Sequence, residues 1–279
     1  MSRARPGSAV VSLAALDLRR RPDHRSELRS QLLLGEVVDV LGVAPARPGW
    51  WRVRNRADGY PGWVRSWGLV PASRARAARW LKRARVRVAV PSTTARALPG
   101  GGAAVSPLHL NARVIAGARR GGRRKVELPD GRRGWVPVRD LARIGDRPPR
   151  LEDRVLGLLG VPYLWGGRTA LGWDCSGFTQ QVLAERGIAL PRDAVEQFRA
   201  CRPIGAADAG REGDLVFFAA RGRRVQHVGL ALGGAWFADC RGRTRITSLD
   251  PRNPMCDKEL IAQLRGFGRP VQKPRVGVR

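Results

Sequence analysis

The segment that decides how this chain folds is Tyr163-Leu-Trp-Gly-Gly-Arg-Thr-Ala-Leu-Gly-Trp-Asp-Cys-Ser-Gly-Phe-Thr-Gln180. Its Gly-rich aromatic loop runs into Asp174 and Cys175, and a helical pattern follows. Cys175 therefore lies at the first turn of a predicted helix, with Asp174 at the cap position. Unpaired backbone N–H groups and the positive end of the helix dipole favour a thiolate there. Since an isolated cysteine is more often a buried structural residue, the rest of the chain has to supply the partners of a reactive thiol.

The residues around this segment mix helical and extended patterns. Apolar spacing predicts helices over 151–159, ending at Gly160, over 175–186, stopping at Gly187, and over 193–199. Strand patterns occupy 214–218, 225–232, 236–239 and 243–247. Helices followed by strands indicate an α+β domain. Paired prolines within residues 145–150 mark where this domain begins.

Residues 10–72 have the pattern of short strands joined by turns. The stretches 15–19, 32–41 and 50–54 are β-rich, and the turn Asp58-Gly59 follows them. Asp-Gly between alternating runs is a strong hairpin signal, because both turn positions tolerate positive φ. We expect a small all-β barrel here.

The chain also contains an internal repeat. Asp58-Gly-Tyr-Pro-Gly-Trp-Val64 recurs 72 residues later as Asp130-Gly-Arg-Arg-Gly-Trp-Val136, and an alternating strand precedes each copy. A hairpin ending in this motif resembles the bacterial SH3-like domain, so the sequence predicts two tandem barrels, the second of them divergent. Residues 71–86, between the copies, are a linker or a short helix. The predicted domains are 10–72, 73–144 and 150–272, with the linker in the second.

A thiol nucleophile needs a base within hydrogen-bonding distance. Of three histidines, His24 and His109 fall in the predicted barrels, which leaves His227 near the start of a strand. The four cysteines show no C-x-x-C spacing and no histidine at metal-ligand spacing, so we predict no metal and no cofactor. The cysteine count alone leaves disulfides open.

Five motifs in a fixed order carry a resemblance to a known family. They are Trp165–Gly167, Asp174–Phe178, Leu190–Arg192 with Gln197, Gly213–Phe218 and His227–Gly233. Together they resemble the NlpC-type cysteine peptidases, papain-like enzymes that cut cell-wall peptides, and they cover most of residues 151–247. The resemblance implies that Cys175 is the nucleophile and His227 the general base. The implied fold is α+β, a papain-like catalytic domain preceded by two all-β SH3-like barrels.

The third catalytic position departs from the family pattern. The family usually has a histidine on the strand after the base, whereas counting without gaps from His227 places Asp239 there. A carboxylate that accepts from the ring N–H would fix the tautomer, stabilise the imidazolium and raise the pKa of His227. The alternative is that Asp239 faces solvent.

Tandem SH3-like domains ahead of the peptidase narrow the resemblance. This arrangement is similar to the γ-D-glutamyl-L-diamino-acid endopeptidases, which release L-Ala-γ-D-Glu from murein peptides with a free N-terminal L-Ala. The resemblance implies an amine pocket with a carboxylate from Asp174 and a hydroxyl from Tyr163, lined by Trp165 and Ser176. In that group the first barrel closes one end of the cleft, which adds two candidate residues there, Glu36 and Trp67.

The charge is far from balanced, with 52 Lys and Arg against 23 Asp and Glu, a net +29. Because arginines occur in every segment, we attribute the excess to codon bias, with attraction to anionic partners as the alternative. The basic residues form no aromatic-lined stripe, so we expect no specific nucleic-acid partner. Two functional alternatives stay open: a non-catalytic wall-binding protein, and an amidase or acyltransferase that uses the same Cys–His pair.

The sequence predicts no membrane span, because no apolar run reaches about 18 residues. Residues 9–16 superficially resemble a signal peptide, but 13–19 alternate like a strand and no small-residue cleavage site follows. We therefore expect a cytoplasmic protein, with a secreted or wall-associated one as the alternative. The expected partners are murein-derived peptides, and the oligomeric state is left open.

Overall fold

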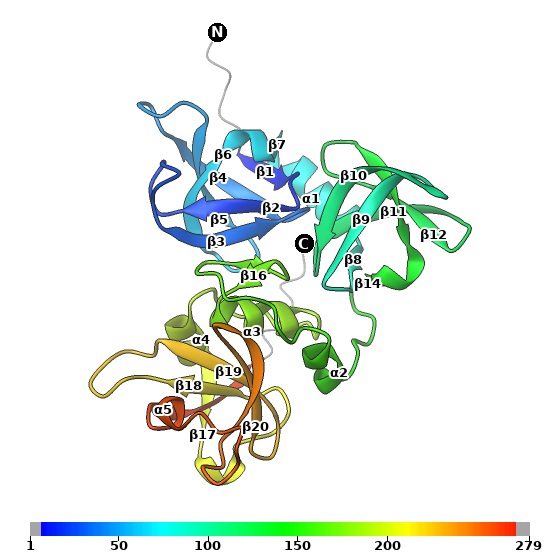
Figure 1. The fold of residues 1–279 in the computed structure, drawn as a ribbon. Helices are drawn as coiled ribbons and strands as arrows, with labels where there is room; N and C mark the ends of the chain where they lie inside the picture. The colour runs from blue at the N-terminus through cyan, green and yellow to red at the C-terminus, as the bar shows by residue number, and fades with distance from the viewer. Residues whose placement is uncertain (1–6, 272–279) are drawn as a thin grey trace. The chain divides into compact units, whose positions relative to one another are not determined.

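The computed structural model describes residues 7–271, and the chain divides into two compact units between Asp146 and Arg147. In Figure 1 the first unit runs from blue to green and consists mainly of strands, while the second runs from green to red and adds helices to its sheet. The predicted bounds of three domains, 10–72, 73–144 and 150–272, stay predictions.

The first barrel is a seven-stranded sheet in the order β3-β2-β6-β5-β4-β1-β7. Its strands are β1 Ser8–Val11, β2 Ala15–Arg19, β3 Leu28–Leu33, β4 Val37–Val43, β5 Trp50–Asn55, β6 Pro61–Arg65 and β7 Leu69–Ala72. The predicted hairpin is confirmed, since the Asn55 N–H donates to the Tyr60 carbonyl at 3.0 Å. The leucine-rich stretch 32–41 is two strands and not one, because Gly35, with φ of +84°, turns the chain between β3 and β4.

The second barrel repeats the first. Its strands are β8 Val86–Val88, β9 Ser92–Leu98, β10 Gly101–His109, β11 Arg113–Arg120, β12 Arg123–Glu127, β13 Arg133–Pro137 and β14 Leu141–Arg143. Their order is β10-β9-β13-β12-β11-β8-β14, the order of the first sheet with each label raised by seven. A 3-10 turn precedes the last strand in both, at Ser66–Gly68 and Val138–Asp140. The predicted tandem repeat is confirmed.

Helix α1, Arg74–Arg83, joins the two barrels. Of the two alternatives for residues 71–86, a linker or a short helix, the helix is therefore the one observed. The indole Nε1 of Trp80 donates to the carbonyl of Gly35 at 2.9 Å. A Cβ on Gly35 would also collide with the backbone carbonyl of Arg113 in the second barrel. Glycine is therefore required at this position, because the two barrels approach each other through its backbone.

The second unit is built on a six-stranded sheet in the order β17-β22-β18-β19-β20-β21. Its strands are β17 Cys201–Ile204, β18 Leu215–Phe218, β19 His227–Gly233, β20 Trp236–Arg241, β21 Arg243–Ser248 and β22 Leu264–Pro270, with a small hairpin of β15 Arg168–Thr169 and β16 Gly172–Trp173. Its helices are α2 Leu151–Leu156, α3 Cys175–Ala184, α4 Ala194–Ala200 and α5 Lys258–Ile261, besides the 3-10 turn Ala206–Asp208. This α+β unit matches the predicted class.

Some boundaries differ from the prediction. Helix α2 ends at Leu156 and not at residue 159, because the following Gly157 caps its C-terminus. The strands β17 and β22 and the helix α5 were not predicted. Helix α3 is buried from Cys175 to Leu183, and its Phe178 and Val182 pack with sheet residues in one apolar core. A helix enclosed in this way holds the thiol at its first turn in a fixed position.

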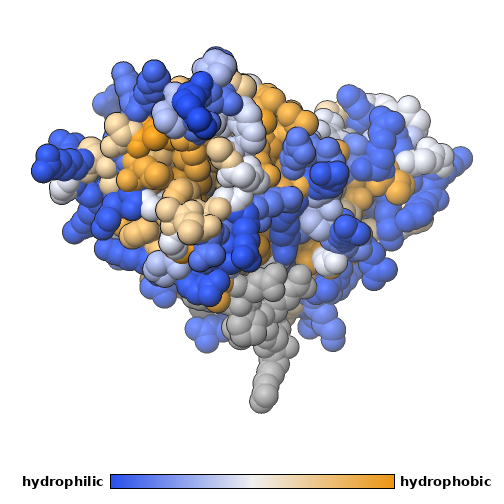
Figure 2. Space-filling model, turned by 90° about the horizontal axis from the view of Figure 1, so that it is seen from below, coloured by the Kyte–Doolittle hydropathy of each residue, from blue (hydrophilic) through white to orange (hydrophobic). Residues whose placement is uncertain are grey.

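Among residues 7–271, no helix is long and apolar enough to cross a membrane. Figure 2 shows hydrophilic side chains spread over much of the face in view, with apolar patches between them. That distribution agrees with a sequence whose arginines occur in every segment.

Candidate active site

Cys175 is the first residue of α3, as predicted, and Asp174 caps the helix. The Asp174 Oδ1 accepts a hydrogen bond from the Gly177 N–H at 2.7 Å. A Cβ on Gly177 would collide with the carbonyl of Gly167, so the W-G-G loop packs directly on the first helical turn. The thiol is thus held where backbone N–H groups and the helix dipole favour negative charge.

The Asp174 carboxylate is also part of a buried ion pair with Arg192. The Arg192 guanidinium donates to both carboxylate oxygens, with Nη1 2.9 Å from Oδ1 and Nη2 2.6 Å from Oδ2. The Gly166 N–H and the Ser176 hydroxyl donate to the same carboxylate at 2.9 and 3.1 Å. Counting the cap bond to Gly177, five donors meet a group with about four lone-pair sites. Asp174 therefore locks the loop, the helix start and Arg192 together.

Arg192 belongs to the L-P-R motif of the sequence resemblance, but no role was predicted for it. The side chain is 1% exposed, so its charge requires a partner, and Asp174 supplies one. Gln197 from the same motif donates to the carbonyls of Ser176 and Pro191 at 3.0 and 2.9 Å. Both side chains hold the thiol segment from α4 and the loop before it.

His227 and Asp239 are brought together on neighbouring strands. The distance from His227 Nε2 to Asp239 Oδ2 is 2.7 Å, and the Asp239 residue is fully buried at 0% exposure. The alternative in which Asp239 faces solvent is therefore wrong. The His227 ring also packs at a tilt on Phe218, with 5.8 Å between ring centroids. The strand pairing β19 to β20 thus fixes both ends of the imidazole–carboxylate contact.

The thiol and the carboxylate together determine the protonation of His227. Burial alone would lower the pKa of His227, but the negative charge of Cys175 and the hydrogen bonds to Asp239 and Cys175 outweigh it and raise the pKa from 6.5 to about 10. Since Nε2 faces Asp239, Nδ1 is the nitrogen left for the thiol. At neutral pH the His227 ring is therefore protonated and can form an ion pair with a thiolate.

Asp239 has further partners that sequence reasoning missed. Arg245, on β21, donates from Nε to Asp239 Oδ1 at 3.0 Å, and the Thr247 hydroxyl lies 3.5 Å from the same oxygen. The only sequence signal for them was the alternation of the strand after Asp239. The two oxygens of this carboxylate thus face different partners, His227 on one side and Arg245 on the other.

The predicted pocket residues in the second unit surround the thiol segment. Burial and the negative charges of Cys175 and Asp174 raise the pKa of Tyr163 well above its usual value, so its hydroxyl stays protonated and can donate a hydrogen bond. Trp165 is 61% exposed and available for contact with a ligand. Ser176 is buried, and its hydroxyl accepts from Arg192 at 2.9 Å besides donating to Asp174.

The two candidates in the first barrel have different environments. The Glu36 carboxylate accepts from the Leu33 N–H at 3.0 Å and from the Asn55 amide at 3.3 Å. Trp67 is 62% exposed on the 3-10 turn before β7. Their contact with a substrate stays a prediction.

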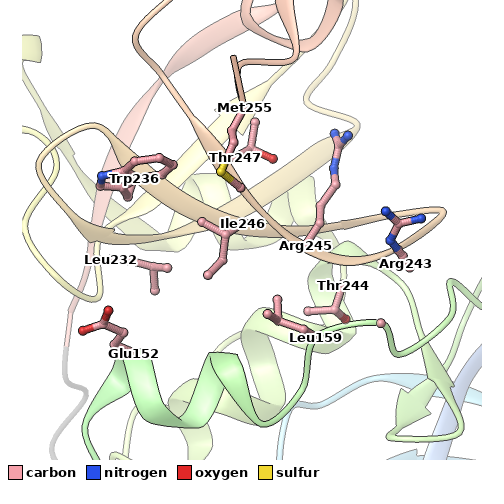
Figure 3. A pocket seen from close by; sticks show the side chains of 11 residues that line it. Glu152, Leu159, Leu232, Trp236, Arg243, Thr244, Arg245, Ile246, Thr247 and Met255 are labelled. Carbon is pink, nitrogen blue, oxygen red and sulfur yellow. The ribbon is translucent and has the colours of Figure 1, made fainter. Parts of the chain in front are cut away.

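Within residues 7–271, no group of three or more His, Cys, Asp or Glu side chains is arranged to hold a metal ion. All four cysteines are free thiols, which answers the question of disulfides. A separate pocket lies beside the edge strand β21, with Ile246 and Leu159 among its lining residues (Figure 3). Neither Cys175 nor His227 lines it.

Comparisons with known proteins agree with this geometry. Residues 160–265 match the model of the NlpC/P60 family, and residues 18–69 match the bacterial dipeptidyl-peptidase SH3 domain. A gamma-D-glutamyl-L-lysine dipeptidyl-peptidase of Bacillus subtilis is 29% identical over 254 residues, which are 86% of this chain and 81% of the relative. The enzyme of the same name from Bacillus cereus is 34% identical over 118 residues, which are 39% of this chain and 35% of the relative.

The fold is also found in solved structures. The crystal structure of an NlpC/P60 family protein from Bacillus cereus superposes with a TM-score of 0.79 at 22% identity, covering 94% of this chain and 99% of that one. At this identity the likeness shows the fold alone. The chain therefore carries an NlpC/P60 domain preceded by a bacterial dipeptidyl-peptidase SH3 domain.

Proposed function

We propose that this protein is a cysteine peptidase that hydrolyses murein peptides at the bond between γ-D-Glu and the diamino acid. In this proposal Cys175 is the nucleophile, His227 the general base and Asp239 the residue that orients the base. The observation that carries it is the 2.7 Å contact of His227 with buried Asp239, in a site where Cys175 interacts with His227 and raises its pKa. The names of the two Bacillus relatives support the bond class.

The reaction follows from the protonation of the site. The Cys175 thiolate attacks the γ-glutamyl carbonyl, and the backbone N–H of Cys175 at the helix start stabilises the oxyanion. The His227 imidazolium then gives its proton to the leaving amine, which departs as the diamino acid. His227, now neutral, takes a proton from water as the water attacks the thioester, and the dipeptide leaves with Cys175 restored.

We also propose that the substrate's free N-terminal amine binds beside Asp174 and Tyr163. The phenol of Tyr163 is close enough to Asp174 to feel its charge. Because Arg192 already forms an ion pair with Asp174, the substrate ammonium would be a second cation on this carboxylate. Amine recognition therefore needs further partners: the Glu36 carboxylate is a candidate acceptor, and the exposed rings of Trp165 and Trp67 are candidates for cation–π contact. The cytoplasmic location likewise stays a prediction.

The test is incubation with L-Ala-γ-D-Glu-diaminopimelate and detection of L-Ala-γ-D-Glu by mass spectrometry. We expect release by the wild type, a loss of about 10³-fold or more in Cys175→Ala, and normal release by the matched control Cys256→Ala. Release that survives in Cys175→Ala would refute the nucleophile. A wild type that binds cell wall but releases no dipeptide would instead favour the non-catalytic alternative.

Acetylation of the substrate's alanine amine tests specificity separately. We expect cleavage of the blocked peptide to fall at least about 10²-fold, because an ammonium-binding site loses its ionic partner. Equal cleavage of free and blocked peptides would remove the amine pocket from the proposal while leaving the Cys–His chemistry intact. Transfer of the acyl group to added amines in place of water would favour the acyltransferase alternative.

A further inference from the structure

Buried Asp239 is one link in a longer chain of charges. Its second oxygen is bound by Arg245, whose Nη2 also donates to Asp257 Oδ2 at 2.7 Å. Asp257 in turn accepts from Arg241 at 2.7 Å and caps α5 through the Leu260 N–H at 3.0 Å. The Arg245 guanidinium is therefore anchored at both ends, between the catalytic carboxylate and the start of a helix.

The strand direction explains why Arg245 reaches Asp239. Arg245 and Asp239 are directly paired across β21 and β20, so their side chains leave the same face of the sheet. Figure 3 shows the Arg245 side chain directed away from Leu159, although Arg245 is itself among the residues that line this pocket. Its hydrogen bonds to Asp239 and Asp257 hold the guanidinium beside the catalytic carboxylate.

We propose that Arg245 is a positioning residue that lowers the proton affinity of His227 through Asp239, so that the imidazolium can release its proton to the leaving amine. It does so by holding one carboxylate oxygen, which leaves the other aimed at the imidazole, and by compensating the charge of the carboxylate. This role rests on the proposed function of the Cys175–His227 pair and extends it to a residue that touches neither.

The direction of the effect follows from charge balance. When His227 loses its proton, Asp239 becomes a buried anion whose remaining cation is Arg245. Without Arg245 that state is disfavoured, so His227 keeps its proton to higher pH and is a weaker acid. Asp257 acts in the opposite sense, because its carboxylate shares the guanidinium; the hydrogen bonds from Arg245, Leu260 and Arg241 outweigh burial and lower the pKa of Asp257 to about 2.

Other charged groups surround the pair on every packed element. They are Cys175 on α3, Asp239 and Arg241 on β20, Arg245 on β21, and Asp257 and Glu259 at α5, while Tyr163 and Cys240 also sense the charge of Cys175. Because the charge of Cys175 also raises the pKa of His227, the effect of Arg245 on that pKa is best measured in a protein that lacks the thiol.

The test is the imidazole ¹⁵N titration of His227 by NMR in the full-length Cys175→Ala protein, where three histidines give a simple spectrum. We expect Arg245→Met to raise the titration midpoint of His227 by about one pH unit and Arg245→Lys to restore it, since a point charge suffices. Asp257→Asn, which keeps the helix cap, should lower the midpoint. Arg252→Met is the control, because that arginine is 89% exposed.

An unchanged midpoint in Arg245→Met, or a shift that Arg245→Lys does not reverse, would overturn the proposal. In the protein with Cys175, Arg245→Met should lower kcat about tenfold, move the alkaline limb of the pH–rate profile upward and leave KM unchanged. Since the NMR titration needs no turnover, it still reports on Arg245 if no dipeptide is released. Failure of the peptidase proposal and failure of this one are therefore distinguishable.

Discussion

Two buried carboxylates stand on either side of the Cys175–His227 pair, and each is held by an arginine. Asp174 accepts five hydrogen bonds: two come from Arg192, in the loop before α4, and the other three come from two backbone N–H groups and a hydroxyl of the segment that carries the thiol. Asp239 binds Arg245 through one oxygen and gives the other to His227. Asp174, whose hydrogen-bonding capacity is filled, therefore holds the site together, whereas Asp239 keeps one oxygen for His227 and takes part in the chemistry.

The largest expected effect is on folding, at Asp174. We expect Asp174→Ala to destabilise the second unit by about 3–5 kcal/mol, because it leaves the buried Arg192 charge without a carboxylate and removes a helix cap. Urea unfolding followed by circular dichroism measures this. The control is Asp250→Ala, whose partner Arg252 is exposed, and its unfolding midpoint should not change. An Asp174→Ala protein that is as stable as the wild type but inactive would contradict the structural role assigned to Asp174.

The next effect is on rate, at Asp239. Asp239→Asn should lower kcat by about 10²- to 10⁴-fold, because an amide can present its N–H₂ to the imidazole and select the wrong tautomer. Steady-state kinetics with the murein peptide measures it. The unfolding midpoint should fall less than in Asp174→Ala, since Asn keeps the volume and Arg245 keeps Asp257. Loss of folding without any rate defect in the folded fraction would contradict the division of roles.

His227 also links the site to stability. Its pKa is about 10 in the folded protein against 6.5 ordinarily, so its contribution is complete below pH 6.5 and is lost as the pH rises through 10. We expect the unfolding free energy of the wild type to decline between these values. The decline should be smaller in His227→Gln, measured by urea titrations across that range. Parallel curves for the two proteins would show that the pair is not charged.

The smallest effect is expected at Thr247, whose hydroxyl lies 3.5 Å from Asp239, at the limit of a hydrogen bond. Thr247→Val keeps the shape and should change kcat by less than about threefold. A larger loss would mean that Asp239 depends on all of its donors, as Asp174 does, and would weaken the contrast.

Local signals in the sequence predicted much of the fold. Asp58-Gly59 and its repeat at Asp130 fixed two hairpins, because turn chemistry depends on neighbouring residues only. The break at Gly35 was missed, because a single glycine inside a strand pattern also fits a bulge within one strand. Strand β22, with Gly266, Gly268 and Pro270, has weak strand propensity and is held by its two neighbours, β17 and β18.

The sequence predicted those residues of the site that belong to recognisable motifs or to the strand that follows them. Cys175, His227 and Asp239 follow from motif order and strand counting, and the structure brings His227 and Asp239 into contact. Arg192 and Arg245 could not be assigned, because their roles depend on a loop returning 18 residues later and on cross-strand register. A chain with 52 basic residues gives no hint of which of them pair with the carboxylates of the site.

The most direct test of the central claim is to trap the acyl-enzyme. Wild-type protein is mixed with L-Ala-γ-D-Glu-diaminopimelate, quenched in acid within milliseconds and mapped by peptide mass spectrometry. The account predicts an L-Ala-γ-D-Glu thioester on Cys175, absent from the Cys175→Ala protein. Dipeptide release with no adduct on Cys175 in either protein, or an adduct on another residue, would contradict it.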